Sequence, residues 1–386
     1  MTSPRVFFYV QHLLGIGHLA RASRIASALT TAGFDVTVVT GGSEVPGFPA
    51  QGIKSVVLPA VLAATAGFSG LADIHGKPVN DEFLTRRRDL LLDAFHRVRP
   101  DIVITEAFPF GRRQMRFELL PLLDAIKAMV PRPILVSSIR DILQERTKPG
   151  RDEETVSLVK AHFDHVLVHG DRSFVALPET FPLAGEIEGK IIYTGLVAGP
   201  LPKEPGEVFD VVVSAGGGAV GIDLIRAALA LAQRSDPRRS WCLITGPNLS
   251  ETDFAELALN ASDHVRLFRF RKDFPSLLKS AELSISQAGY NTVCDILQAG
   301  CRSVLVPFTA GGETEQNLRA MRLASLGLAV AIPEVGLSAD ILRGAVEAAL
   351  AECPPRSGRL DLNGARRTGD ILGELFEARR IQQASS

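Results

Sequence analysis

Residues 6–40 read VFFYVQHLLGIGHLARASRIASALTTAGFDVTVVT, and this stretch decides the fold. Val6–Val10 is an unbroken run of aromatic and β-branched residues, which predicts a strand buried on both faces. A loop with glycines follows, and in Leu19–Leu29 the apolar residues recur at helical spacing. Gly33 ends this helix, and Phe34–Thr40 supplies a second strand. The order strand, loop, helix, strand predicts a parallel βαβ unit.

The same alternation continues along the chain. In the first half, further buried strands are predicted at 102–105, 134–138 and 166–168, each separated by enough residues for a crossover helix. In the second half, strands are predicted at 211–213, 242–245, 265–268, 283–286, 303–306 and 329–332. The pattern therefore predicts an α/β protein built on parallel sheets.

The chain has 386 residues, which is enough for two domains. Residues 199–206 contain three prolines and two glycines, which exclude a helix or a central strand. We therefore predict an N-terminal domain at 1–199, a linker at 200–206 and a second domain at 207–355. Residues 356–386 form the C-terminal segment, in which a basic amphipathic helix is predicted at about Ala365–Arg380.

Composition excludes several classes of protein. The 42 Lys and Arg residues against 43 Asp and Glu residues leave no basic excess, which argues against nucleic-acid binding. No run of 18 uncharged apolar residues is present, so we expect no transmembrane helix. The N-terminus lacks the features of a secretory signal, which predicts a cytoplasmic protein whose four scattered cysteines stay reduced.

The first glycine loop carries a candidate base. Residues 15–20, GIGHLA, fit the relaxed G-x-G-x-x-A dinucleotide pattern, but the second strand ends without the acidic residue that an NAD site needs. His18 is predicted at a helix start, where the helix dipole lowers the pKa of an imidazole and favours its neutral form. His18 is therefore a candidate general base, with a simple helix cap as the alternative.

Two carboxylates at predicted strand ends, Glu106 and Asp141, are rival candidates for the base. Arg112, Arg113 and Arg140 lie close to them in sequence and are suited to an anionic acceptor or to a membrane surface. The alternative is a helix face of solvated arginines over buried phenylalanines. Three histidines bracket the strand at 166–168, and we do not predict that they bind a metal.

The second domain begins with another glycine loop. Gly216–Gly218 follows a strand of three valines, so its backbone amides are suited to a phosphate, or simply to a tight turn. Asp295 lies three residues after Thr292 on one helix face, where its carboxylate could accept ribose hydroxyls or face solvent. Glu315 and Gln316 follow a strand end, at the edge where α/β proteins bind ligands.

Taken in order, these motifs resemble the GT-B glycosyltransferases, and specifically the family 28, MurG-like group. The matching features are the GxGH loop at 15–18, the glycine loop at 216–218, the S-x-A-G-x-x-T-x-x-D stretch at 286–295, Val-Pro-Phe at 306–308, and Glu-Gln at 315–316. The resemblance covers most of the chain. Asp295 stands where glutamate is usual, which indicates a divergent member.

The resemblance implies a GT-B architecture, in which two Rossmann-like parallel-sheet domains face a central cleft and the C-terminal helix packs back on the first domain. It implies transfer of a hexosyl or N-acetylhexosaminyl group from a nucleotide sugar, preferably UDP-linked, to a hydroxyl acceptor. Transfer would proceed with inversion and without a metal or cofactor. The implied acceptor is a glycan, a lipid-linked intermediate or a small molecule, in cell-envelope glycan or glycolipid synthesis with peripheral contact at the inner face of the membrane.

The resemblance also implies roles for residues of the donor domain. The nucleotide base would be framed by Phe268, Arg269 and Phe270, and Asp295 would hold the ribose. The diphosphate would lie near Gly216, Gly217, Gly289 and Tyr290, and the sugar would contact Glu315 and Gln316. The remaining candidate donor-binding residues are Gly17, Gly218, Ser286, Ala288, Asn291 and Thr292.

Two other functions fit the same sequence. A nucleotide-sugar 2-epimerase shares the fold and would form its product without an acceptor. A non-catalytic nucleotide-sugar-binding subunit would bind the donor without turnover.

Overall fold

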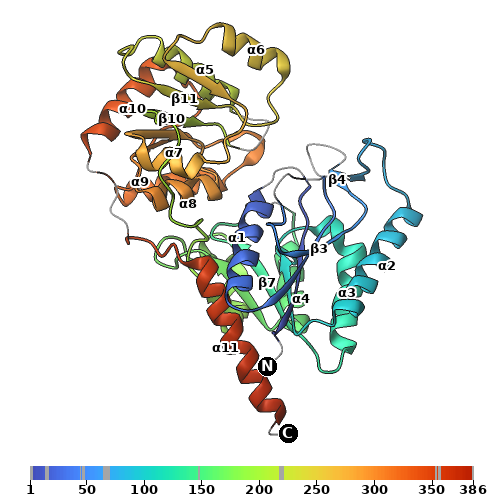
Figure 1. Ribbon diagram of the computed structural model, residues 1–386. Coiled ribbons are helices and arrows are strands. Elements are labelled where there is room, and N and C mark those ends of the chain that lie inside the picture. Colours follow the sequence, from blue (N-terminus) through green and yellow to red (C-terminus); the bar gives the residue numbers. More distant parts are fainter. Residues whose placement is uncertain are drawn as a thin grey trace. The chain divides into compact units, whose positions relative to one another are not determined.

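The computed structural model describes residues 3–13, 17–43, 45, 48–63, 70–146, 148–216, 221–352, 354 and 358–384. The chain divides into two compact units, Met1–Val197 together with Asn363–Ser386, and Ala198–Leu362. Each unit is built on its own parallel sheet with helices on its faces (Figure 1). The prediction of two parallel-sheet α/β domains is confirmed.

The sheet of the first unit has the described strand order β3-β2-β1-β6-β7-β8-β9, and all of its neighbouring strands are parallel. Phe7, Phe8 and Tyr9 are completely buried, because helices cover both faces of the central strand, as its unbroken apolar run predicts. The strands are β1 (Arg5–Val10), β2 (Asp35–Thr40), β3 (Lys54–Val57), β6 (Ile102–Glu106), β7 (Ile134–Arg140), β8 (His165–His169) and β9 (Ile191–Tyr193), with a short antiparallel pair β4 (Leu62–Ala63) and β5 (Leu71–Ala72) beside them.

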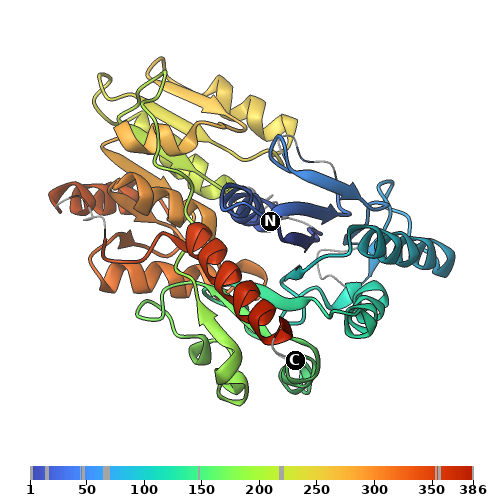
Figure 2. The same ribbon diagram turned by 60° about the horizontal axis from the view of Figure 1, so that its bottom comes forward.

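Two sets of helices enclose this sheet. Helices α2, α3 and α4 pack on one face around Phe95, Leu119 and Val159, and α1 and α11 lie side by side on the other (Figure 2). The helices are α1 (Gly17–Thr31), α2 (Asp81–Val98), α3 (Arg116–Ala128), α4 (Arg151–His162) and α11 (Gly364–Ala384), with short 3-10 helices at η1 (Arg113–Met115), η2 (Leu177–Glu179) and η3 (Pro182–Lys190).

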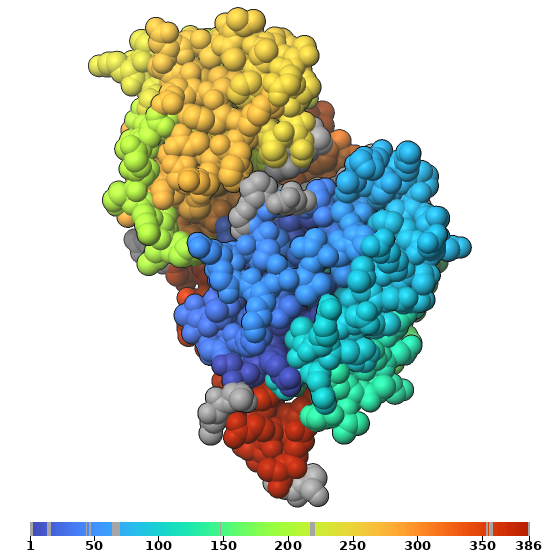
Figure 3. Space-filling view, turned by 45° about the vertical axis from the view of Figure 1, so that its right-hand side comes forward, coloured from blue at the N-terminus to red at the C-terminus, as the bar shows by residue number. Residues whose placement is uncertain are grey.

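The C-terminal helix α11 returns to the first unit through small residues. Val197 and Asn363 form an antiparallel bridge, and the amide of Gly364 donates to the carbonyl of Leu196 at 3.0 Å. Further along α11, Gly369 lies against Ala32, the residue that follows α1. The last turns of α11 are exposed, and Figure 3 shows them projecting as a red surface.

The observed boundaries therefore differ from the predicted ones. The first unit ends at Val197 and resumes at Asn363, and the second unit includes both the predicted linker at 200–206 and residues 356–362. The bridge between Val197 and Asn363 explains the difference. It pairs the residue at which the chain leaves the first unit with the residue at which it returns, so both belong to that unit.

The second unit has the described strand order β12-β11-β10-β13-β14-β15, again all parallel. The single tryptophan, Trp241, is buried on the face covered by α5, α6 and α10, and α7, α8 and α9 lie on the other side of the sheet (Figure 1). The strands are β10 (Val211–Ser214), β11 (Trp241–Ile244), β12 (Val265–Phe268), β13 (Leu283–Ser286), β14 (Ser303–Leu305) and β15 (Val330–Ala331). The helices are α5 (Ile222–Ala232), α6 (Glu251–Leu259), α7 (Phe274–Ser280), α8 (Tyr290–Ala299), α9 (Glu315–Ser325) and α10 (Ala339–Ala351), with a 3-10 turn η4 (Ala310–Gly312).

Three cysteines, Cys242, Cys294 and Cys301, are buried, as predicted; Cys353 lies outside the described residues. Burial raises the pKa of the Cys242 and Cys301 thiols to about 12, so neither forms a thiolate near neutral pH. Within the described ranges, none of the helices combines the length and apolar character needed to cross a bilayer.

The close approach at Gly364 generates a stability test. A Cβ at Gly364 would lie 2.3 Å from the carbonyl oxygen of Gly195, whereas a Cβ at Gly373 in the same helix would meet nothing within 4 Å. Gly364→Ala should lower the free energy of unfolding by about 1–3 kcal/mol. Gly373→Ala should raise it by about 0.5–1 kcal/mol, since alanine is the better helix former. Urea unfolding followed by circular dichroism checks both values, and equal effects would contradict the packing described for α11.

Candidate functional site

The candidate site of the first unit forms where the central strands end. Glu106 is the last residue of β6 and lies in register with Val10 of β1 and Ser138 of β7. In the same way, Arg140 at the end of β7 is in register with His169 at the end of β8. Helix α1 begins beside this edge at Gly17. Because parallel strands end together, side chains distant in sequence meet at the edge where α/β proteins bind ligands.

Glu106 is the centre of this group. Its side chain is completely buried and accepts hydrogen bonds from Arg21, from His18 Nδ1 at 2.9 Å and from Ser138 Oγ at 2.5 Å. Burial alone would raise the pKa of Glu106, but the Arg21 charge and these hydrogen bonds outweigh it and hold the pKa well below its usual value. Glu106 is therefore a fixed anion, which makes it unsuitable as the base that takes a proton.

His18 is held by that anion. Its side chain is only 16% exposed and lies at the start of α1. Burial and the positive charge of Arg112 lower the pKa of His18 well below its usual value, against the opposing effect of Glu106. The contact with Glu106 places the ring proton on Nδ1 and leaves Nε2 as the proton acceptor. A neutral imidazole in this tautomer has the properties of a general base.

A second histidine extends the network. Ser138 Oγ lies 2.9 Å from His169 Nε2, and His169 Nδ1 lies 2.8 Å from Thr194 Oγ1. Burial, followed by the charge of Arg21, lowers the pKa of His169 to about 3. His169 therefore stays neutral and fixes the orientation of the Ser138 hydroxyl that binds Glu106. This role of His169 was not predicted from the sequence, where its position at a strand end was the available signal.

The remaining predicted residues of the first unit lie around this group. Asp141 is completely buried, and its carboxylate accepts a hydrogen bond from the amide of Ile142 at 2.9 Å. The backbone of Gly170 passes so close to it that a Cβ at Gly170 would lie 2.8 Å from the Cβ of Asp141. Arg113 forms an ion pair with Glu154 of α4. The structure therefore brings His18, Glu106 and the arginines to one edge, and the role of Asp141 as a base stays a prediction.

A buried polar network lies behind the loop after β1. The fully buried Arg87 binds Glu118 at 2.7 Å and donates to Gln11 Oε1 at 2.7 Å. Tyr9 donates to Glu118 at 2.5 Å, and its pKa is raised by burial and by Glu118. The carbonyl of Gln11 accepts from Arg112 Nε at 2.5 Å. The network thus links α2 and α3 to an arginine beside His18, and its pairing was not predicted.

The candidate donor site of the second unit also lies at strand ends. Ser214 of β10 and Ser286 of β13 are in register, and Gly216 and Gly289 follow them. Gln287 is 4% exposed, and its amide nitrogen has no hydrogen-bond partner among the described residues. A buried amide donor beside Gly216 is suited to a phosphate oxygen, and Gln287 was not among the predicted site residues. The predicted Gly217 and Gly218 lie outside the described residues.

Helix α8 begins at this point without a side-chain cap. Gly289 is its N-cap residue and contributes only backbone, so the first-turn amides of α8 face the end of the sheet. Tyr290, Asn291 and Thr292 form this first turn, and Asp295 is 7% exposed one turn later. The uncapped helix start favours an anionic group, as predicted for the diphosphate.

Glu315 and Gln316, the predicted sugar contacts, begin α9. Glu315 is 2% exposed and pairs with the completely buried Arg319 at 2.8 Å, and Arg319 also donates to the carbonyl of Ala288 at 2.9 Å. Gln316 Oε1 accepts from the amide of Phe308 at 3.2 Å. Arg319 therefore connects α9 to the turn before α8 through a hydrogen bond to the Ala288 carbonyl. Sequence reasoning missed it, and contact of Glu315 and Gln316 with a sugar stays a prediction.

The predicted base-framing turn is partly engaged in protein contacts. Arg269 lies over the ring of Phe254 and pairs with Glu251 at 2.8 Å. Phe268 is flanked by two other arginines, whereas Phe270 is 63% exposed. An exposed aromatic ring beside a fixed guanidinium remains suited to stacking with a nucleotide base.

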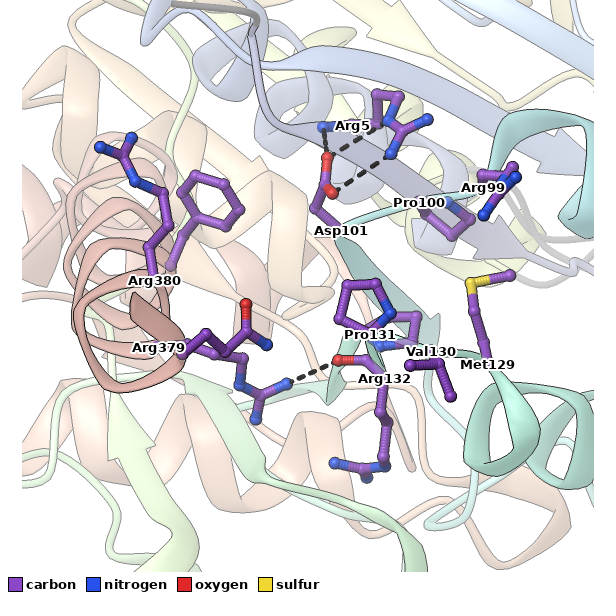
Figure 4. Close-up of a pocket in the computed structure, with 13 residues that line it drawn as sticks. Arg5, Arg99, Pro100, Asp101, Met129, Val130, Pro131, Arg132, Arg379 and Arg380 are labelled. Carbon is purple, nitrogen blue, oxygen red and sulfur yellow. Dashed lines mark hydrogen bonds and ion pairs between the residues drawn. The ribbon is translucent and has the colours of Figure 1, made fainter. Parts of the chain in front are cut away.

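A separate small pocket lies at the opposite edge of the first sheet. Figure 4 shows its lining residues, which come from the strand starts and the end of α11, around a volume of about 70 Å³. Asp101 pairs with Arg5, and Arg379 donates to the carbonyl of Arg132 at 3.2 Å. Every residue predicted for the function lies elsewhere, and these contacts attach α11 to the sheet.

Comparisons with known proteins show what the sequence and the fold of this chain are similar to. Residues 211–355 match the family model of the glycosyltransferase family 28 C-terminal domain. A UDP-N-acetylglucosamine--N-acetylmuramyl-(pentapeptide) pyrophosphoryl-undecaprenol N-acetylglucosamine transferase from Gloeobacter violaceus is 28% identical over 165 residues, which cover 41% of this chain and 46% of the relative. The chain thus spans about half the length of this curated relative.

Solved structures share the fold over nearly the whole chain. The calicheamicin glycosyltransferase CalG4 has a TM-score of 0.60 at 19% identity and covers 100% of this chain and 98% of its own. MurG of Acinetobacter baumannii has a TM-score of 0.58 at 14% identity, with 96% and 100% covered. These likenesses show that the chain has a GT-B fold. Within this fold, the second unit is similar to the glycosyltransferase family 28 C-terminal domain, and part of the chain is similar to a MurG-type transferase.

The network at Arg87 generates a test with a neighbouring control. Arg87→Met leaves Glu118 buried without its partner and should lower the free energy of unfolding by about 3–5 kcal/mol. Arg88 is the next residue of α2, its side chain is 36% exposed, and it forms an ion pair with the adjacent Asp89. Arg88→Met should change the free energy by less than about 0.5 kcal/mol. Denaturant unfolding of both variants checks the difference, and similar values would show that the buried pair contributes little.

Proposed function

We propose that this protein transfers a hexosyl or N-acetylhexosaminyl group from a nucleotide sugar to an acceptor hydroxyl, with inversion at the anomeric carbon. The observation that carries the proposal is the pair of His18 and Glu106, a neutral imidazole whose tautomer is set by a buried carboxylate. Neither a metal ion nor a cofactor takes part in the proposed reaction.

His18 is the proposed general base. Its Nε2 takes the proton of the acceptor hydroxyl while the oxygen attacks the anomeric carbon and the nucleoside diphosphate leaves. Glu106 stabilises the imidazolium that forms at His18 and does not itself become protonated, as the low pKa of its carboxyl supports. The attack comes from the side opposite the leaving group, which inverts the configuration.

The second unit is the proposed donor site. The leaving diphosphate gains negative charge, and the amides at the start of α8, with Gly216 and the amide of Gln287, are suited to stabilise it. Asp295 is the proposed ribose contact. UDP is the proposed nucleotide, since the name of the Gloeobacter relative includes a UDP-linked sugar.

The proposed acceptor is a glycan, a lipid-linked intermediate or a small molecule in cell-envelope glycan or glycolipid synthesis. We propose that the protein works in the cytoplasm, with peripheral contact at the inner face of the membrane.

Donor binding is tested by thermal unfolding of the full chain with UDP, TDP, GDP and CDP. A nucleotide at about a hundred times its dissociation constant should stabilise the protein by roughly 2.7 kcal/mol. UDP should give the largest shift, and Asp295→Ala should abolish it. The control is Asp263→Ala, which changes an exposed carboxylate of the same unit and should leave the shift intact. A UDP shift that survives in Asp295→Ala would remove Asp295 from the site.

The base is tested by steady-state transfer assays. His18→Ala should lower kcat by about 10²- to 10⁴-fold while the thermal shift with UDP stays unchanged. His75→Ala, at an exposed position, is the matched control and should retain full activity. Full transfer by His18→Ala together with loss of transfer in Asp141→Ala would assign the base to Asp141. Product formed without any acceptor would indicate epimerisation instead.

The pH profile separates the roles of the pair. Because the pKa of His18 lies well below its usual value, kcat/KM should rise with pH only in the acidic range and stay flat through neutrality. Glu106 raises the pKa of His18, so Glu106→Gln should move this acidic limb to lower pH while reducing kcat. A limb that moves to higher pH would contradict the assigned contact.

A further inference from the structure

A chain of buried hydrogen bonds continues from the pair of His18 and Glu106 across the first sheet. Glu106 and Ser138 are in register at the ends of β6 and β7, and His169 ends the next strand, β8. These three side chains project from the same face of the sheet, because in-register neighbours and alternate residues of a strand share a face. They and Thr194, which follows β9, are at most 1% exposed. Polar groups buried in this way depend on their hydrogen bonds for stability.

The two oxygens of the Glu106 carboxylate have different partners. Oε1 accepts from Arg21 and from His18 Nδ1, which lies at 2.9 Å. Oε2 accepts from Ser138 Oγ at 2.5 Å. The terminal torsion of a glutamate side chain is soft, so contacts to one oxygen alone would leave the carboxylate free to turn. The contact at Oε2 is a second anchor, and it keeps Oε1 directed at the imidazole.

Ser138 can form this contact in one direction only. A serine hydroxyl carries a single proton, and an ionised carboxylate can only accept. Because Glu106 is a fixed anion, the proton of Ser138 points to Oε2. Ser138 Oγ also lies 2.9 Å from His169 Nε2, and its only proton is already used. The proton between these two atoms must therefore belong to His169.

This contact assigns His169 to one tautomer. Burial, followed by the charge of Arg21, lowers the pKa of His169 to about 3, so its ring carries one proton near neutral pH. With that proton on Nε2, Nδ1 can only accept, and Thr194 Oγ1 lies 2.8 Å from it. The carbonyl of Gly195 lies 2.9 Å from the same hydroxyl and competes for its proton. The direction of the chain is therefore set at Ser138, where the acceptor is charged.

We propose that Ser138 and His169 are positioning residues of the transfer reaction. His169 carries its proton on Nε2 and donates a hydrogen bond to Ser138, whose hydroxyl holds Glu106 Oε2. Oε1 is thereby kept in line with the Nδ1 proton of His18. This inference rests on the proposed function and adds the residues that support its catalytic pair. The contact at Oε1 strengthens when His18 takes the proton of the acceptor and becomes a cation, and a carboxylate that is already aligned needs no reorganisation at that moment.

The tautomer is tested by nitrogen-15 NMR of the full chain labelled at its histidines. The two tautomers of a neutral imidazole differ in which ring nitrogen bears the proton, and the nitrogen chemical shifts distinguish them. His169 should carry its proton on Nε2 near neutral pH, and its signals are identified by their loss in His169→Gln. A proton on Nδ1 would overturn the proposal. This measurement needs neither a substrate nor an active variant.

Steady-state transfer assays test the positioning role. Ser138→Ala should lower kcat by roughly tenfold to a hundredfold, as expected for loss of a hydrogen bond to a charged group, while KM for the donor and the thermal shift with UDP stay unchanged. In His169→Gln, the side-chain amide nitrogen takes the place of Nε2 and can still donate to Ser138. In His169→Asn, it takes the place of Nδ1 and cannot. The glutamine variant should therefore retain more activity than the asparagine variant.

Ser137→Ala is the matched control. Ser137 precedes Ser138 on β7, is completely buried, and donates to the carbonyl of Phe108 at 2.8 Å on the other face of the sheet. Thr105 Oγ1 also donates to that carbonyl at 2.7 Å, so the substitution leaves it paired. Ser137→Ala should leave kcat unchanged. Equal losses of kcat in the two serine variants or in the two histidine variants, or full activity of Ser138→Ala, would overturn the proposal.

Failure of the proposed function gives a different result. A wild type that shows neither a thermal shift with UDP nor transfer would reject the function, and the positioning role with it. Transfer by a wild type in which the proton of His169 lies on Nδ1 would reject the positioning chain alone.

Discussion

A single buried charge organises the first unit. The carboxylate of Glu106 is removed from water at the end of a central strand, and an ionised group in that position is stable only if the protein supplies its partners. Those partners come from α1, through Arg21 and His18, and from β7, through Ser138. Satisfying one carboxylate therefore fixes the start of a helix and the ends of two strands. His169 and Thr194 continue the constraint to β8 and the segment beyond β9.

The candidate site of the second unit relies on backbone groups, whereas that of the first unit relies on charged side chains. In the second unit, these groups are the amides at the uncapped start of α8 and the backbone of Gly216, where the positive φ of 75° suits glycine. Its buried ion pair, Glu315 with Arg319, lies behind the site and fixes the turn at Ala288. The first unit thus presents side chains suited to moving a proton, and the second presents amides suited to negative charge.

Much of the fold was predictable because strands buried on both faces are rich in apolar residues, as the runs of β1, the first three residues of β6 and the three valines of β10 are. β3 and β9 were missed because they are short strands whose residues are largely exposed or half-buried. His18 and Glu106 were selected as separate candidates from their places at a helix start and a strand end. Their pairing could not be read from the sequence, since His18 and Glu106 are 88 positions apart and meet only because the sheet brings them together. The same applies to Arg319, which resembles any other helical arginine until its burial is seen.

The position of Arg112 has a consequence for water, the nucleophile that competes with any acceptor. Burial, followed by the charge of Arg112, lowers the pKa of His18, so its neutral imidazole is a weaker base than a histidine in water. In the proposed reaction, such a base acts efficiently only on a hydroxyl that is held in place beside Nε2. A loosely bound water molecule is therefore at a disadvantage against a positioned acceptor, which disfavours hydrolysis of the donor.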